Sequence, residues 1–195
     1  MAMVTAMMRP LGVALRGVRA GVAGLATQSR WVAATPECIR LHSPAFGHGV
    51  DLPARFTADG AGLSPPLIWT GVPQGARSLL LLVEDADIPF VTPLVHALAY
   101  AIPPELRSLG EGAIPASLQG EEPEGLQCGR NGFGRAGWLP PAPPFGHGPH
   151  HYAFQMLALD NLPSFPTPPS RHAALAQARG HLLGWGVLFG VYERA

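Results

Sequence analysis

The chain has 195 residues, 47% of them apolar, and a formal net charge of zero at pH 7. This length suits one domain with a sizeable core, and the apolar content argues against a disordered chain in spite of 24 glycines and 22 prolines. All 13 basic residues are arginines. Because they form no basic stripe, the sequence gives no support for nucleic-acid binding.

Residues 1–36 differ in composition from the rest of the chain. Their only charges are four arginines, Arg9, Arg16, Arg19 and Arg30, and the pattern resembles an organelle presequence. Arg16 and Arg19 interrupt the apolar run that a secretory signal needs, and no apolar run is long enough to span a membrane. We expect a disordered or targeting extension that is dispensable for folding, with a helix on a membrane surface as an alternative. A cytoplasmic location is expected unless this extension is a targeting segment.

From residue 37 to residue 195 the pattern predicts one domain of short strands and turns. The expected strands are residues 37–41, 66–70, 78–83, 94–102, 151–160 and 185–192. The uninterrupted apolar run Leu79–Val83 indicates a strand buried on both faces. Residues 103–128 are expected to be loop, and Arg171–His181 is the one helix expected in this part. Short strands, one late helix and no βαβ alternation favour a mainly β fold, a Greek-key β-sandwich with long Gly/Pro-rich loops.

Two motifs permit other interpretations. Residues 132–137 match the spacing of a dinucleotide-binding loop, but Pro140 and Pro141 follow too soon for the helix that such a loop opens. His147, His150 and His151 could ligate a metal, although no fixed zinc-binding spacing accompanies them. A metal-assisted hydrolase therefore remains an alternative, and the prediction is no metal and no cofactor. Cys38 and Cys128 could pair only by tertiary proximity, which the sequence leaves open.

Two segments about fifty residues apart carry the polar side chains of a candidate site. The first holds Asp85, Asp87 and His96, and the second holds His150 and Tyr152 after a proline-rich turn. A buried carboxylate can fix the tautomer of an imidazole, whose other N–H can then donate to an anion. Because no activated nucleophile accompanies them, these residues suit an anion-binding pocket better than a hydrolytic site, and we expect no enzyme.

An ordered series of motifs over residues 38–194 resembles the phosphatidylethanolamine-binding protein family, bacterial branch, also called Raf kinase inhibitor-like proteins. The motifs are Ser43-Pro44-Ala45-Phe46, Ser64-Pro65-Pro66-Leu67-Ile68-Trp69, Asp85-Ala86-Asp87-Ile88-Pro89, Gly129–Gly134, and Pro141–Gly146 leading to His150-His151-Tyr152. The resemblance implies a β-sandwich and a pocket for phosphate, acetate or phosphoryl head groups. It implies a non-catalytic binding protein, or alternatively an inhibitor of a kinase or hydrolase, with a second copy of the chain as a further possible partner.

Carried over by residue, the resemblance implies a pocket of six residues: Asp85, His96, Pro141, His150 and Tyr152, with Asp87 behind them. It also implies a cis peptide bond at Ile88–Pro89. Three positions depart from the family pattern, because Ala86 replaces a proline, Ala97 replaces a tryptophan and Pro140 replaces a glycine. The departures make the fold a firmer expectation than the ligand.

Overall fold

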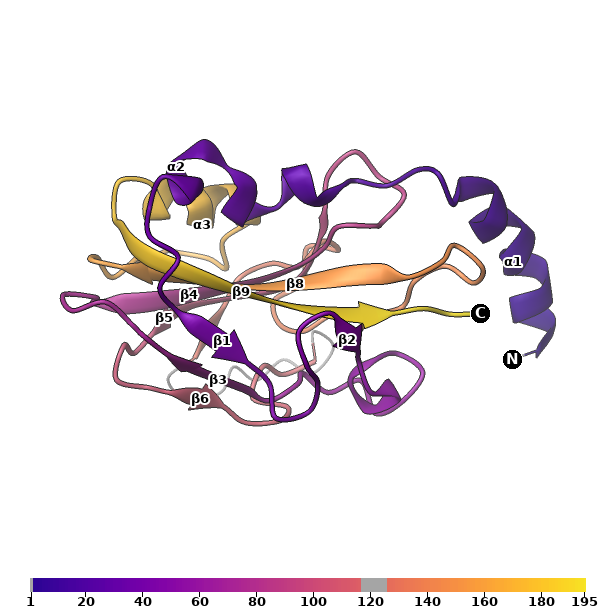
Figure 1. Cartoon of the computed structure of the whole chain (residues 1–195), viewed down its shortest axis with the longest axis horizontal. Coiled ribbons are helices and arrows are strands. Elements are labelled where there is room, and N and C mark those ends of the chain that lie inside the picture. The colour runs from indigo at the N-terminus through magenta and orange to yellow at the C-terminus, as the bar shows by residue number, and fades with distance from the viewer. Residues whose placement is uncertain (1, 117–125) are drawn as a thin grey trace.

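The computed structural model describes residues 2–116 and 126–195, with side chains from Arg9 onward within these ranges. Its two sheets are a six-stranded sheet of order β2-β9-β8-β4-β5-β7 and a three-stranded sheet of order β1-β3-β6 (Figure 1). The strands are β1 (Arg40–His42), β2 (Val50–Asp51), β3 (Leu67–Thr70), β4 (Ser78–Asp85), β5 (Leu94–Ile102), β6 (Ser108–Leu109), β7 (Gln127–Cys128), β8 (His150–Leu159) and β9 (Leu182–Tyr192). The helices are α1 (Ala2–Leu15), α2 (Arg30–Ala33) and α3 (Arg171–Ala178), with short 3-10 turns at Val22–Gly24, Ala26–Gln28 and Ala54–Phe56.

The mainly β fold with two sheets and a late helix is confirmed, and each of the six expected strands has a counterpart. The strands β2, β6 and β7 were not expected, and two of them lie in the stretch 103–128 that was expected to be loop. Part of that stretch, 117–125, falls outside the described residues. The Greek-key path remains a prediction.

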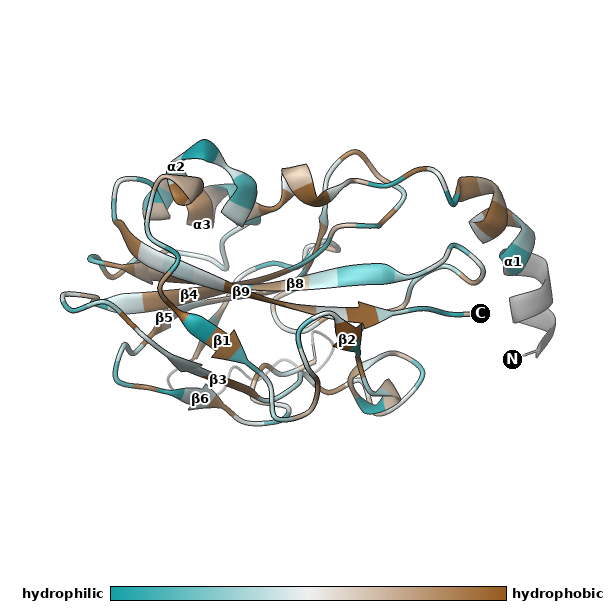
Figure 2. Ribbon diagram, in the orientation of Figure 1, coloured by the Kyte–Doolittle hydropathy of each residue, from teal (hydrophilic) through white to brown (hydrophobic). Residues whose placement is uncertain are grey.

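Strand β4 is buried on both faces, as its apolar run predicts. Leu79, Leu81 and Val83 enter the core between the two sheets. Leu80 and Leu82 point to the other face, where α3 and the N-terminal segment cover the sheet (Figure 1). Strands carry side chains on alternate faces, so a strand with a layer on each side needs apolar residues at every position. In Figure 2 the polar colour gathers instead at one end of β8.

Residues 22–33, which include α2, lie against the same face of the six-stranded sheet as α3, and α1 lies beyond one end of the sheet (Figure 1), whereas a disordered extension was expected. Leu25, Ala26, Thr27 and Val32 are at most 2% exposed. The expectation rested on four arginines that have no acidic partner within the segment. The sheet supplies the apolar surface, and Asp87, just after β4, supplies an acidic partner for Arg19.

The segment is anchored by a buried carboxylate in β4. Glu84, which is fully buried, accepts hydrogen bonds from the backbone N–H of Ala26 at 3.0 Å, from Gln155 Nε2 at 2.7 Å and from Arg171 Nε at 2.5 Å. The Gln155 Oε1 atom accepts from both the N–H and the hydroxyl of Thr27, at 2.8 and 2.9 Å. A buried charge is stable only when its hydrogen-bonding capacity is used. The N-terminal segment therefore completes the polar network inside the sheet.

The two cysteines are far apart across the strand order of the six-stranded sheet. The Cys38 N–H donates to Trp185 of β9, whereas Cys128 pairs with Ala99 of β5 at the far edge. Four strand spacings, roughly 19 Å, separate β9 from β7. A disulfide requires Cα atoms less than about 7 Å apart, so these two cysteines do not pair. Among the described helices, none has the length and apolar character to cross a bilayer.

Candidate functional site

The expected site residues meet at one end of the six-stranded sheet. Asp85 ends β4 and lies directly opposite Tyr152 of β8, and His150 begins β8. A register shift separates the pairs Val83–Ala97 and Glu84–Val95 and leaves His96 outside the ladder between β4 and β5. Such bulges turn side chains out of the regular alternation. The His96 ring consequently lies edge-on to Tyr152, with ring centres 5.0 Å apart.

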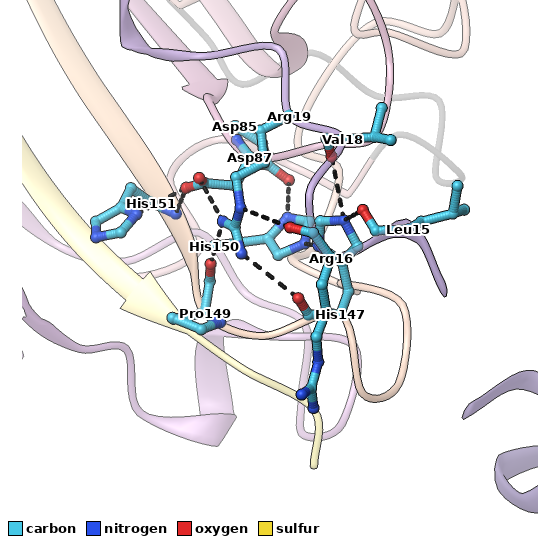
Figure 3. A network of polar contacts seen from close by, with 10 residues as sticks. All are labelled: Leu15, Arg16, Val18, Arg19, Asp85, Asp87, His147, Pro149, His150 and His151. Carbon is cyan, nitrogen blue, oxygen red and sulfur yellow. Dashed lines mark hydrogen bonds and ion pairs between the residues drawn. The ribbon is translucent and has the colours of Figure 1, made fainter. Parts of the chain in front are cut away.

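A chain of hydrogen bonds runs from a buried carboxylate through two imidazoles (Figure 3). Asp85 Oδ2 lies 2.7 Å from His150 Nδ1, and His150 Nε2 lies 2.8 Å from His147 Nδ1. His147 Nε2 lies 2.9 Å from the carbonyl oxygen of Leu15 and 3.3 Å from that of Val18. Both imidazoles are fully buried.

This chain holds one proton more than two neutral imidazoles supply. The carbonyl of Leu15 can only accept, so His147 Nε2 carries a proton, and a proton must also lie between the two rings. The contact with the Asp85 carboxylate needs a third. A neutral imidazole has a single N–H, so the third proton is held by the pair of Asp85 and His150.

The extra proton lies between His150 Nδ1 and Asp85, and not on His147. Burial and the neighbouring His150 lower the pKa of His147, which favours the neutral ring there. His150 Nε2–H therefore donates to His147 Nδ1. The other oxygen of Asp85, Oδ1, accepts from the Asp87 N–H at 2.8 Å.

His96 and Tyr152 present polar atoms that have no partner within the part of the chain that the structure describes. His96 Nδ1 donates to the Leu139 carbonyl at 2.7 Å, and burial lowers the pKa of this histidine, so Nε2 is a bare acceptor. The Tyr152 hydroxyl is likewise unpartnered, and burial followed by the charge of Asp85 raises its pKa, so it keeps its proton. The indole N–H of Trp138, whose ring centre lies 6.4 Å from that of His96, is a third such group.

Asp87, expected behind the other site residues, contacts His151 and the N-terminal segment. Its Oδ2 accepts from both the N–H and the ring of His151, each at 2.7 Å, and its Oδ1 accepts from Arg19 at 2.5 Å. Burial would raise the pKa of Asp87, but these donors hold it below its ordinary value.

The expectation of a cis bond at Ile88–Pro89 is wrong, because the described residues contain no cis peptide bond. The chain turns back by another device. The Asp87 N–H donates to the side chain of Asp85 two residues earlier, and an Asx turn of this kind bends the chain with trans peptides.

Pro141 is buried, and its carbonyl accepts from the Ala58 N–H at 2.9 Å; it lies two residues after Leu139, whose carbonyl accepts from His96. Ala86, one of the departures from the family pattern, donates its N–H to the His151 carbonyl at 3.1 Å and packs against Leu25. Proline has no N–H to donate. The alanine therefore makes a backbone hydrogen bond to His151 and also packs against the N-terminal segment.

Several residues that shape the site were not predicted from the sequence. Arg19 and Leu15 reach it from the N-terminal segment, and Trp138 reaches it from a loop. His147 was noted only as a candidate metal ligand. Among the described residues no group of three or more His, Cys, Asp or Glu side chains is placed to hold a metal ion.

The two neutral buried histidines should make the folded protein less stable in acid. Their pKa values are lowered in the folded state, whereas histidine in the unfolded chain takes up its proton near pH 6.5. Below that pH the unfolded state binds more protons, so the free energy of unfolding falls by up to about 1.4 kcal/mol per pH unit for each group. The stability is thus present above about pH 6.5 and is lost as the pH falls. We expect the thermal midpoint to decrease between pH 6.5 and 5.

A matched pair of variants checks this dependence. His147→Gln removes one titrating ring and should flatten the decrease, whereas His172→Gln alters an exposed histidine of α3 and should leave it unchanged. Equal slopes in wild type and His147→Gln would contradict the assignment of a neutral His147.

Comparison with known proteins places this geometry in a family. The family model for phosphatidylethanolamine-binding protein matches residues 42–193. A UPF0098 protein of Pyrococcus abyssi is 38% identical over 152 residues, which cover 78% of this chain and 84% of that protein. The crystal structure of a phosphatidylethanolamine-binding protein homologue from Chlamydia trachomatis superposes with a TM-score of 0.73 at 32% identity, covering 82% of this chain and 99% of that one. Escherichia coli YbcL, described as a new member of the mammalian family, gives a TM-score of 0.73 at 28% identity, with 80% and 99% covered.

Proposed function

The chain belongs to the phosphatidylethanolamine-binding protein family, and on that premise we propose that it is a non-catalytic protein that binds a small anion or the phosphoryl group of a larger ligand. The binding groups are His150, His96 and Tyr152, with Asp85 orienting His150. Inhibition of a kinase or hydrolase, the alternative raised by the sequence, would involve a protein partner and is not required by this pocket.

The observation that carries the proposal is the set of buried polar atoms left without partners. The Tyr152 hydroxyl and His96 Nε2 belong to side chains at most 2% exposed. An unsatisfied buried polar group costs about 1–3 kcal/mol, so such groups mark places where a ligand completes the hydrogen bonding. Beside them, His150 is held by Asp85 through Nδ1, and its Nε2–H is a third donor for an oxyanion.

The donor and acceptor roles of the three binding groups favour a particular class of anion. Tyr152 and His150 are donors, but His96 Nε2 is an acceptor because its other nitrogen donates to Leu139. An oxyanion that carries a hydroxyl can donate to His96 while it accepts from the other two. Hydrogen phosphate and a protonated phosphomonoester have such a hydroxyl, whereas sulfate has none.

Calorimetric titration of the full chain with phosphate and with sulfate at pH 7 tests this function. Phosphate should bind more tightly by about 5- to 150-fold, since loss of one hydrogen bond to a charged partner costs about 1–3 kcal/mol. His96→Asn is the matched variant, because the asparagine amide can still donate to Leu139 but offers no counterpart of Nε2. Its preference for phosphate should shrink toward equality. Absence of phosphate binding would contradict the function, and equal affinity for both ions in wild type would contradict the role of His96.

A further inference from the structure

The candidate site is covered by the chain's own N-terminal segment. Arg16 Nε donates to the Gly146 carbonyl at 2.6 Å. Arg19 Nη1 donates to Asp87 Oδ1 at 2.5 Å and to the Pro149 carbonyl at 2.8 Å. Both arginines are thus bound by acceptors of the folded domain, as Figure 3 shows for Arg19.

The backbone of this segment is held as well. The N–H of Ala20 donates to the Ile88 carbonyl at 3.0 Å, and that of Gly21 donates to the Ala86 carbonyl at 2.7 Å. Further back, α1 lies so close to the domain that a Cβ on Gly12 would stand 2.0 Å from the carbonyl oxygen of Phe145. The close contact extends over ten residues of the segment.

His147 joins the covering segment to the anion-binding groups. Its Nε2–H donates to Leu15, and its Nδ1 accepts the Nε2–H of His150, the same proton that the proposed function assigns to the anion. The single Nε2–H of His150 cannot make a well-aligned hydrogen bond to His147 and to an anion at the same time. An anion at His150 therefore displaces the His147 ring, and displacement of that ring breaks its contact with Leu15.

We infer that residues 85–89 and 145–151 form a cradle for an arginine-bearing peptide segment, and that residues 12–21 of this chain occupy it as an internal ligand that competes with the anion. The inference rests on the proposed function, because it concerns the regulation of the same site. The family match covers residues 42–193, so the cradle lies within the matched region and its occupant lies before it. Binding of an anion releases residues 12–21, and closure of the segment weakens anion binding.

Hydrogen exchange of the full chain follows the release directly. Saturating phosphate should speed exchange of the Ala20 and Gly21 amides by about tenfold or more, the change expected when a mostly closed contact opens. The amides of Ala26 and Thr27 serve as the internal control, because they bond to Glu84 and Gln155 outside the cradle. Their exchange should not change.

A double variant distinguishes the inference from a simple effect of charge, because the two predict opposite changes in phosphate affinity. Arg16→Ala/Arg19→Ala in the full chain weakens closure, so phosphate should bind about tenfold more tightly or better. Simple electrostatics predicts the opposite, since removal of two positive charges beside an anion site weakens attraction. Arg30→Ala/Arg40→Ala removes the same charge from two exposed positions and should leave the affinity close to that of wild type.

The outcomes separate this inference from the proposed function. Equal or weaker phosphate binding in Arg16→Ala/Arg19→Ala, with unchanged exchange at Ala20 and Gly21, would overturn the internal ligand and leave the anion site standing. Failure of phosphate to bind wild type and both double variants would overturn the proposed function and the inference together.

Discussion

A chain that begins at Ala34 should unfold at least about 10 °C below the full chain. The truncation removes the buried side chains of Leu25 and Val32, each worth about 1.5–3 kcal/mol when fully buried. It also strips donors from Glu84 and Gln155, and each buried group left unsatisfied costs about 1–3 kcal/mol. For a chain of this size, 1 kcal/mol corresponds to about 2–4 °C in the midpoint.

A chain that begins at Gly21 is the matched control. It loses α1 and the arginine contacts at the site but keeps the residues that bond to Glu84 and Gln155. Differential scanning calorimetry should place its midpoint within a few degrees of the full chain. If the chain beginning at Ala34 had the same thermal midpoint as the full chain, residues 1–33 would be dispensable for folding. The hydrogen bonds to Glu84 and Gln155 would then add nothing to stability.

The variant His150→Ala should weaken phosphate binding by about 5- to 150-fold, the equivalent of about 1–3 kcal/mol for a lost charged hydrogen bond. The affected group is the Nε2–H, which Asp85 holds in place through Nδ1 at 2.7 Å. Titration calorimetry gives the affinity, and the thermal midpoint shows whether the variant remains folded.

Two further variants make the result specific. Asp85→Asn keeps the side-chain shape but removes the carboxylate that orients the His150 ring, so it should also weaken phosphate binding. His181→Ala alters an exposed imidazole that pairs with Asp160, away from the candidate site, and should bind phosphate as wild type does. Wild-type affinity in both His150→Ala and Asp85→Asn would remove this pair from the binding site.

The elements predicted well from the sequence are those whose burial follows a local period. Leu79–Val83 is apolar at each position and is buried on both faces, and 94–102 was predicted with the observed bounds. Strands β6 and β7 have two residues each, too few to show alternation. Their pairing with β3 and β5 depends on tertiary contacts alone.

The candidate site residues could be predicted from the sequence, but the hydrogen bonds that connect them to the N-terminal segment could not. Asp85, His96, His150 and Tyr152 lie close together, but one of the two partners of Asp87, Arg19, comes from the N-terminal segment. Arg19 has no acidic residue near it in the sequence, so a local pattern favours an exposed side chain. The structure pairs Arg19 with an acid 68 residues away. Docking of this kind depends on complementary surfaces that no local pattern encodes.

A crystal structure of the full chain grown with phosphate tests the central claim most directly. The account predicts phosphate density between His150 Nε2, the Tyr152 hydroxyl and His96 Nε2, with the His147 ring turned away from His150. A structure at saturating phosphate in which the His147–His150 contact is intact and no anion lies against Tyr152 and His96 would contradict it.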